Sequence, residues 1–226
     1  MFKYFKYEYL SQLKFNLYIF ISVVIINVLL VAKVGNILGF DYNAAFSFDV
    51  FFGLCLAGVH GIFFYNCIKS FITDLYDGRA YLVFSFPVSV YKIVITKIAV
   101  ATINSFTLFL CYVLVQYSNV KDFIILFNSP NMLEVILNTF LFTVWMFSII
   151  YFSIIVVHTI TKSRKFIPLF VILTIIIFWT VETIVSYIFH FIPVNHAEMF
   201  TQVFAVIQII LFMLFSGYIL DKKLEL

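Results

Sequence analysis

Charged residues are scarce in this chain: 14 of its 226 residues are Lys or Arg and 11 are Asp or Glu, whereas 64% are apolar. An ordinary soluble domain is about one quarter charged and about half apolar. A water-soluble protein of this size cannot hide so much apolar surface, because a large part of the folded chain stays exposed. The same composition excludes a disordered chain, and a net charge of +3 does not indicate a nucleic-acid partner. The sequence therefore predicts an integral membrane protein.

Sequence motifs for nucleotide or metal chemistry are also missing. None of the seven glycines is followed by Lys, so the chain lacks the P-loop whose backbone N–H groups hold phosphates, and it contains no H-E-x-x-H. His190, His196 and Glu198 lie close together in sequence, but their spacing matches no closed metal site. The three cysteines fall within apolar runs and are read as small buried hydrophobic residues. We therefore expect no catalytic, cofactor-binding or metal-binding residues in this chain.

The apolar residues form long runs, without the alternation of an outer-membrane barrel strand. Each run approaches the roughly 20 residues that a helix needs to cross a bilayer. Six such spans are predicted, at about 17–32, 45–68, 93–116, 135–159, 167–189 and 200–219. The connections are short, so residues 1–226 are expected to form a single transmembrane domain.

The positions of the cations predict the orientation, since Lys and Arg favour cytoplasmic loops. With the N-terminus inside, only Lys33 and Lys121 among the 14 cations fall in outer segments. Both termini are therefore expected in the cytoplasm, which an even number of spans requires.

Residues 1–16 carry an aromatic stripe. At about 100° per residue, Phe2, Phe5, Tyr9 and Leu13 share one narrow arc, beside Lys3 and Lys14. This pattern is typical of an amphipathic helix lying in the membrane interface. The alternative is an irregular tail whose aromatic residues anchor the first span. The persistence of the stripe over four positions favours the interfacial helix.

Residues 69–92, between the second and third spans, are predicted to be cytoplasmic. Thr73 or Asp74 can cap a short helix, Gly78 can end it, and Ser89 can cap the third span. Pro87 breaks the chain before that span. The pattern predicts a short helix that displays Asp74, Leu75, Tyr76 and Asp77 to a partner, the alternative being a merely structural loop.

The phrase LYDGRAYLVFSFPVSVYKIVITKI resembles the segment that follows the second span in ABC-2 family permeases, the membrane subunits of ABC transporters. The matching positions are Leu75-Tyr76, Tyr81-Leu82, Pro87-Val88-Ser89 and Lys92 to Lys97, whereas Asp77-Gly78-Arg79 stands where the family usually has Glu-Gly or a similar pair. The resemblance extends to the whole layout. It implies an all-α polytopic membrane protein with six transmembrane helices, an N-terminal interfacial helix and a cytoplasmic coupling helix between spans 2 and 3.

The resemblance also implies a function and partners. The chain would be the permease subunit of an ATP-driven exporter in the cytoplasmic membrane, moving an amphipathic or hydrophobic substrate such as an antimicrobial peptide or drug. Two copies of a separate ATPase subunit would bind ATP and Mg²⁺ and hydrolyse the ATP, and a second permease subunit, identical or paralogous, would complete the conduit within the lipid. The ATPase would dock on residues of the coupling segment: Asp74, Leu75, Tyr76, Asp77 and Arg79, with Pro87 shaping the return.

A few polar and small residues inside the spans need an explanation. A carboxylate at mid-bilayer costs about 2.5–3.5 kcal/mol, so Glu182 should face protein or water. Glu182 either lines a substrate path or is a structural group. As a structural group it would stay hydrated near the outer interface or, when protonated, hydrogen-bond to a neighbouring helix. Asn104 and Asn138 are expected to hydrogen-bond between helices or to line a conduit. Gly53, Ala57 and Gly61 form a small-residue face that can pack within the subunit or against a second one.

Three other functions compete with the exporter hypothesis. A proton- or ion-coupled transporter would use Glu182, but it predicts helices broken by Gly or Pro, and the four prolines lie at span boundaries. A membrane protease would need catalytic groups at one depth, and Glu182, His60 and His158 are predicted at different depths. A regulatory or assembly subunit without transport of its own remains an alternative.

Overall fold

The regular structure of the described residues is entirely α-helical. The computed structural model describes residues 2–34, 42–76, 89–116, 132–161, 168–189 and 197–224. In chain order, the six helices of these residues are α1 (Phe2–Val34), α2 (Tyr42–Tyr76), α4 (Val90–Gln116), α6 (Met132–Ile160), α7 (Pro168–Phe189) and α8 (Ala197–Leu224). Helices satisfy their own backbone polar groups, which a chain in lipid must do.

Five of these helices are long and apolar enough to cross a membrane: α1, α4, α6, α7 and α8. Within the described residues, α2 does not meet this criterion. The prediction of an all-helical fold is thus confirmed for the described residues, and five of the six predicted spans lie on helices that are long and apolar enough to cross a membrane. Many hydroxyl groups along the helices bond locally: Thr96 and Thr174, for example, each donate to a carbonyl one turn earlier, at 2.7 Å.

The prediction of a separate interfacial helix at residues 1–16 was wrong. Residues 2–34 form one continuous helix, and its membrane-crossing stretch already begins at Tyr4. No Gly or Pro interrupts the sequence between Phe2 and Val34, so nothing local forces a break. The prediction of a separate coupling helix between spans 2 and 3 was also wrong in part. Thr73 and Asp74 lie inside α2, which continues to Tyr76, and residues 77–88 lie outside the described residues.

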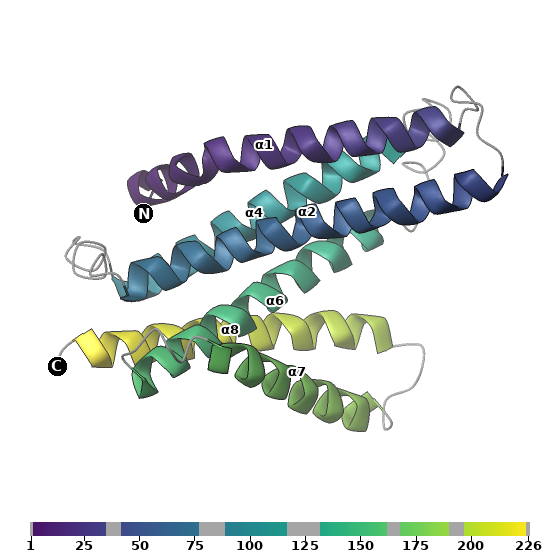
Figure 1. Cartoon of the computed structure of the whole chain (residues 1–226). Helices are drawn as coiled ribbons and strands as arrows, with labels where there is room; N and C mark the ends of the chain where they lie inside the picture. The colour runs from purple at the N-terminus through teal and green to yellow at the C-terminus, as the bar shows by residue number, and fades with distance from the viewer. Residues whose placement is uncertain are drawn as a thin grey trace.

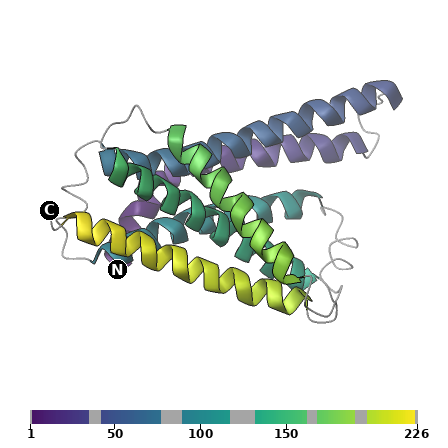
Figure 2. The ribbon, with the colours of Figure 1, turned by 90° about the horizontal axis from the view of Figure 1, so that it is seen from below.

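The helices pack as two groups. α1, α2 and α4 lie on one side of the molecule and α6, α7 and α8 on the other, with α4 also packing against α6 and α8 (Figure 1). Figure 2 shows the same helices from below, with α7 running obliquely to α8. The start of α1 and the end of α8 lie at the same end of the bundle (Figure 1).

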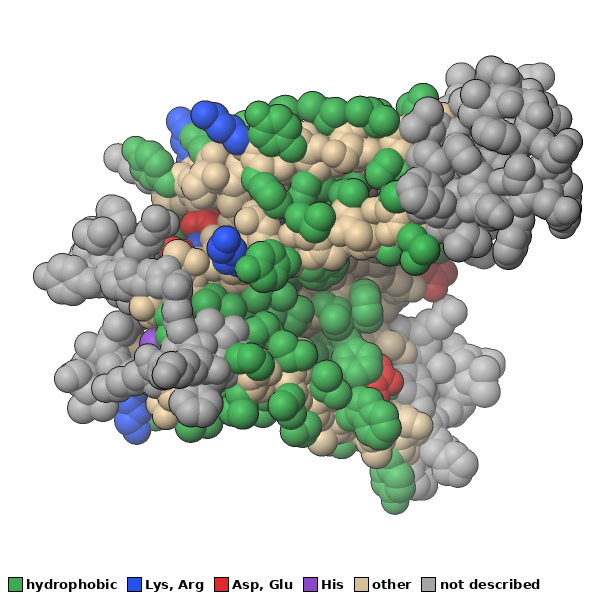
Figure 3. Space-filling view, viewed as in Figure 1, with side chains coloured by type: hydrophobic (Ala, Val, Ile, Leu, Met, Phe, Trp, Pro, Cys, Tyr) green, Lys and Arg blue, Asp and Glu red, His purple; other side chains and the backbone are tan. Residues whose placement is uncertain are grey.

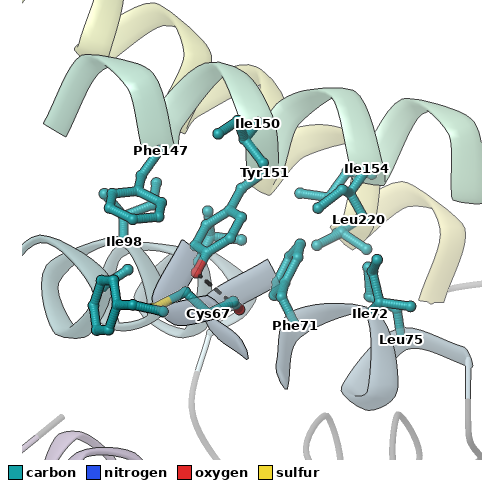
Figure 4. Close-up of a cluster of buried hydrophobic side chains, with 14 of the residues drawn as sticks. Cys67, Phe71, Ile72, Leu75, Ile98, Phe147, Ile150, Tyr151, Ile154 and Leu220 are labelled. Carbon is teal, nitrogen blue, oxygen red and sulfur yellow. Dashed lines mark hydrogen bonds between the residues drawn. The ribbon is translucent and has the colours of Figure 1, made fainter. Parts of the chain in front are cut away.

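The core joins the two groups around one tyrosine. The Tyr151 hydroxyl donates to the backbone carbonyl of Cys67 at 3.4 Å, and its ring stacks on Phe71 with centroids 4.5 Å apart. Phe71 and Ile72 of α2 face Ile154 of α6 in the same cluster (Figure 4). The outer surface of the described helices is mainly hydrophobic, as Figure 3 shows in green for one face. This is the distribution expected of a protein whose solvent is lipid.

Candidate functional site

A buried group of three charged side chains joins α1, α2 and α4. The Lys97 ammonium, on α4, forms an ion pair with Glu8 of α1 at 2.7 Å and a second ion pair with Asp74 of α2. The Lys97 side chain is only 2% exposed, and those of Glu8 and Asp74 are 10% and 16% exposed. We call these three residues the inner triad, because they lie toward the end of the bundle that carries both termini.

The inner triad is surrounded by polar groups from the same helices. Gln12 donates to Glu8 at 2.7 Å, and Ser70 lies 3.3 Å from both the Glu8 carboxylate and the Lys97 amine. Asn104 extends the network one step further by donating to Gln12 at 3.4 Å. The polar stripe therefore follows α1 at four-residue spacing, through Glu8 and Gln12 to the buried Asn16.

The charges of the inner triad stabilise the fold only while all three remain paired. Removing charges from water costs several kcal/mol per ion, and this cost is offset only when the ions pair closely and their remaining hydrogen bonds are made. Here one cation faces two carboxylates, and Ser70 and Gln12 supply the additional hydrogen bonds. Each of three helices contributes one charge, so none of the three helices can shift without separating an ion pair.

Three of the predicted docking residues are described, and each contacts other side chains of the chain. Asp74 belongs to the inner triad, Leu75 is 4% exposed, and Tyr76 packs edge-on against the His158 ring with centroids 4.5 Å apart. Partial burial raises the pKa of Tyr76, while a hydrogen bond with Thr161 opposes this shift. The predicted display to the cytoplasm does not fit Asp74 and Leu75, whose side chains are largely enclosed, whereas Tyr76 is half-buried. The docking role of the three residues stays a prediction.

The other predicted docking residues, Asp77, Arg79 and Pro87, lie outside the described residues. The end of this segment is described: α4 begins directly after Ser89, whose backbone carbonyl accepts from the Lys92 N–H at 2.9 Å. The predicted start of the third span near Ser89 is thus confirmed.

A pocket lies between α6, α7 and α8, at the end of the bundle opposite both termini. Its volume is about 360 Å³ and Glu182 of α7 is on its wall. Asn138 and Trp145 of α6, with Gln202 and Gln208 of α8, also line it. We call it the outer pocket. Two of the predicted conduit residues, Glu182 and Asn138, are thus brought together.

The amide groups of the outer pocket bond to neighbours within its wall. Gln202 donates to Asn138 at 2.9 Å, and the Trp145 indole N–H donates to Gln208 at 2.5 Å. Among the described residues, Glu182 makes no ion pair. The third predicted conduit residue, Asn104, does not belong here, since it lies in the network of the inner triad.

In the described part of the chain, the predicted small-residue face of α2 is open at two of its three positions. Ala57 and Gly61 are exposed, and a Cβ added to Gly61 would meet no atom within 4 Å. Gly53 lies in α2 as expected. Close helix approach occurs instead at Gly217 of α8, where an added Cβ would overlap the ring of Tyr91.

No group of three metal-ligating side chains is found in the described part of the chain. The suggested ligands His190 and His196 lie outside it.

Sequence analysis missed the inner triad. The signal was present, because Glu8, Gln12 and Asn16 recur at four-residue spacing, and Lys97 and Asn104 are seven residues apart. Both spacings place polar groups on one face of a helix. At about 100° per residue, the aromatic stripe with Phe5 and Tyr9 lies on an arc of α1 next to this polar stripe.

Comparisons of the chain with models of known protein families, with characterised protein sequences and with solved structures found no match.

Proposed function

We propose that this chain is the membrane subunit of an ATP-driven exporter in the cytoplasmic membrane, with both termini in the cytoplasm. The local resemblance of residues 75–97 to ABC-2 permeases motivates the proposal. Five membrane-crossing helices are compatible with it, and the missing P-loop requires a separate ATPase subunit.

The strongest structural support for this proposal comes from the inner triad. A permease subunit must pass movement from its cytoplasmic docking segment to the spans. Here the residues just before the undescribed segment 77–88 are locked to the spans, because Asp74 is paired with Lys97 of α4 and, through it, with Glu8 of α1. A force applied at residues 77–88 would therefore move α1, α2 and α4 together.

This coupling changes which residues should bind the ATPase. Asp74, Leu75 and Tyr76 serve as the inner anchor of the coupling segment, while docking falls to residues 77–88, including Asp77 and Arg79. A second permease subunit would complete the conduit, and the exposed Ala57 and Gly61 offer a face for close helix approach.

The test is co-expression of the tagged chain with the ABC ATPase encoded beside its gene, followed by purification in mild detergent. We expect the two to co-elute with ATP hydrolysis. The paired reversal D77K/R79E should reduce co-elution at least ten-fold, because it reverses both charges of the docking segment. The matched control Lys121→Glu, in the predicted outer loop, should leave co-elution unchanged.

Absence of a neighbouring ATPase gene, or co-elution that withstands the D77K/R79E reversal, would contradict the proposal. Asp74 is unsuitable for this test, since its substitution would disturb the inner triad and thereby the fold.

A further inference from the structure

We infer that the outer pocket binds amphipathic organic cations, with Glu182 as the counter-ion and the aromatic side chains of the wall around the apolar part. This inference names the substrate class of the proposed exporter and in that sense rests on the proposed function. Binding itself needs only this chain.

The position of the outer pocket suits a ligand that enters from the outer leaflet or leaves toward it. Asn138 lies six residues from the start of α6, Glu182 seven residues from the end of α7, and Gln202 five residues from the start of α8. At 1.5 Å per residue, these three side chains share a level about 8–10 Å below the helix ends. The volume of about 360 Å³ is within the usual range for small-molecule sites.

The charge of the outer pocket selects for cations. Glu182 is the only ionisable residue on its wall, and all lining residues belong to the described part of the chain. The other polar side chains on the wall have partners: Gln202 donates to Asn138 at 2.9 Å and Trp145 to Gln208 at 2.5 Å, and Thr201 also makes an interaction. Glu182 is therefore the polar group that a ligand would satisfy, and a cation is the partner that a carboxylate in an apolar setting favours most.

The rest of the wall suits an apolar body. Phe142, Trp145 and Phe204 line the pocket together with aliphatic side chains. Aromatic faces attract cations as well as apolar groups. The Trp145 indole is held by its hydrogen bond to Gln208 and by the Phe178 ring, with centroids 5.5 Å apart, so this surface is preorganised.

The fluorescence of Trp145 can be used to measure ligand binding in the outer pocket. The chain has two tryptophans, and the other, Trp179, is 72% exposed and is not among the residues of the pocket wall. In a Trp179→Phe background, the fluorescence of Trp145 reports on the pocket. The probe is methyltriphenylphosphonium, and triphenylphosphine oxide serves as a neutral molecule of nearly the same shape.

We expect saturable binding of the phosphonium to the purified full-length chain, with affinity about ten-fold lower in Glu182→Gln. Glu182→Asp should keep most of the affinity, because it retains the charge. The neutral oxide should bind wild type and Glu182→Gln equally. The matched control is Glu134→Gln, which removes a carboxylate near the same end of α6 but outside the pocket wall.

Equal phosphonium affinity in wild type and Glu182→Gln, or equal affinity for the phosphonium and the oxide, would overturn the inference even if an ATPase associates. A lipid headgroup is the other source of an organic cation. Repeating the titration in phosphatidylcholine and in phosphatidylglycerol nanodiscs distinguishes a lipid headgroup from a transported ligand. An unchanged ratio of wild-type to Glu182→Gln affinity supports a transported ligand, whereas loss of the ratio in phosphatidylcholine assigns the pocket to choline lipid and overturns the substrate assignment.

Discussion

The inner triad and the outer pocket differ in how their carboxylates are compensated. In the inner triad, Glu8 and Asp74 are paired with Lys97 and largely excluded from solvent. In the outer pocket, Glu182 is exposed on the wall of a cavity and is not among the residues that form ion pairs in the described structure. A charge compensated within the chain holds helices together, whereas a charge left open to a cavity is available to a ligand. The two regions therefore differ in whether their charges contribute to the fold.

The largest expected effect comes from removing the cation of the inner triad. Lys97→Met leaves Glu8 and Asp74 facing each other without a counter-ion. Breaking a buried ion pair in this way costs about 3–5 kcal/mol of folding free energy. Denaturant unfolding of the purified chain in detergent would measure this loss. The matched control Lys92→Met changes an exposed lysine of the same helix and should stay within about 0.5 kcal/mol.

A charge-neutral triad distinguishes an electrostatic loss from a steric one. The triple variant K97M/E8Q/D74N removes all three charges at similar side-chain size. Neutral replacements of a buried ion group are often tolerated, so the triple variant should recover most of the stability lost in Lys97→Met. A triple variant as unstable as Lys97→Met would show that packing, and not charge, holds these helices.

The contact between α4 and α8 tests how firmly the two regions are joined. Gly217→Ala places a methyl group where the Tyr91 ring lies. Such overpacking costs about 1–3 kcal/mol, which would outweigh the better helix propensity of Ala. Gly61→Ala on α2 is the matched control: it meets no atom within 4 Å and should stabilise by up to about 1 kcal/mol. Thermal unfolding would show the opposite signs, and Tyr91→Ala should relieve the cost in the double variant.

The membrane class and most helix positions could be predicted from the sequence, because long apolar runs have few alternatives in lipid. The predicted spans 93–116, 135–159 and 167–189 lie within a few residues of α4, α6 and α7. The helix breaks were predicted less well. A cap at Thr73 or Asp74 was plausible locally, but Asp74 gains more from Lys97 than from capping, so α2 continues through it. Tertiary contacts decided the outcome there.

The candidate sites were predictable only in part. Glu182 and Asn138 stood out individually because polar groups are rare in these spans, but their meeting depends on how α6 and α7 cross. Asn104 stood out equally and belongs to a different region. The pairing of Glu8 with Lys97 spans 89 positions of sequence, and a single sequence gives no information about which distant residues meet.

The smallest expected effect is the most direct comparison of the two regions, because it makes the same chemical change in each. Glu8→Gln removes a carboxylate that pairs with Lys97 and accepts from Gln12, and hydrogen bonds to charged groups contribute about 1.5–3 kcal/mol. Glu182→Gln changes an exposed side chain that forms no ion pair among the described residues, so unfolding free energy should change by less than about 0.5 kcal/mol. Parallel denaturant titrations of the two variants and the wild type would measure both. Losses of similar size would mean that Glu182 holds α7 in place, and the outer pocket would then be part of the structural core. A clear loss in Glu8→Gln alone would leave Glu182 as a carboxylate that the fold does not need, as expected of a group that acts on a ligand.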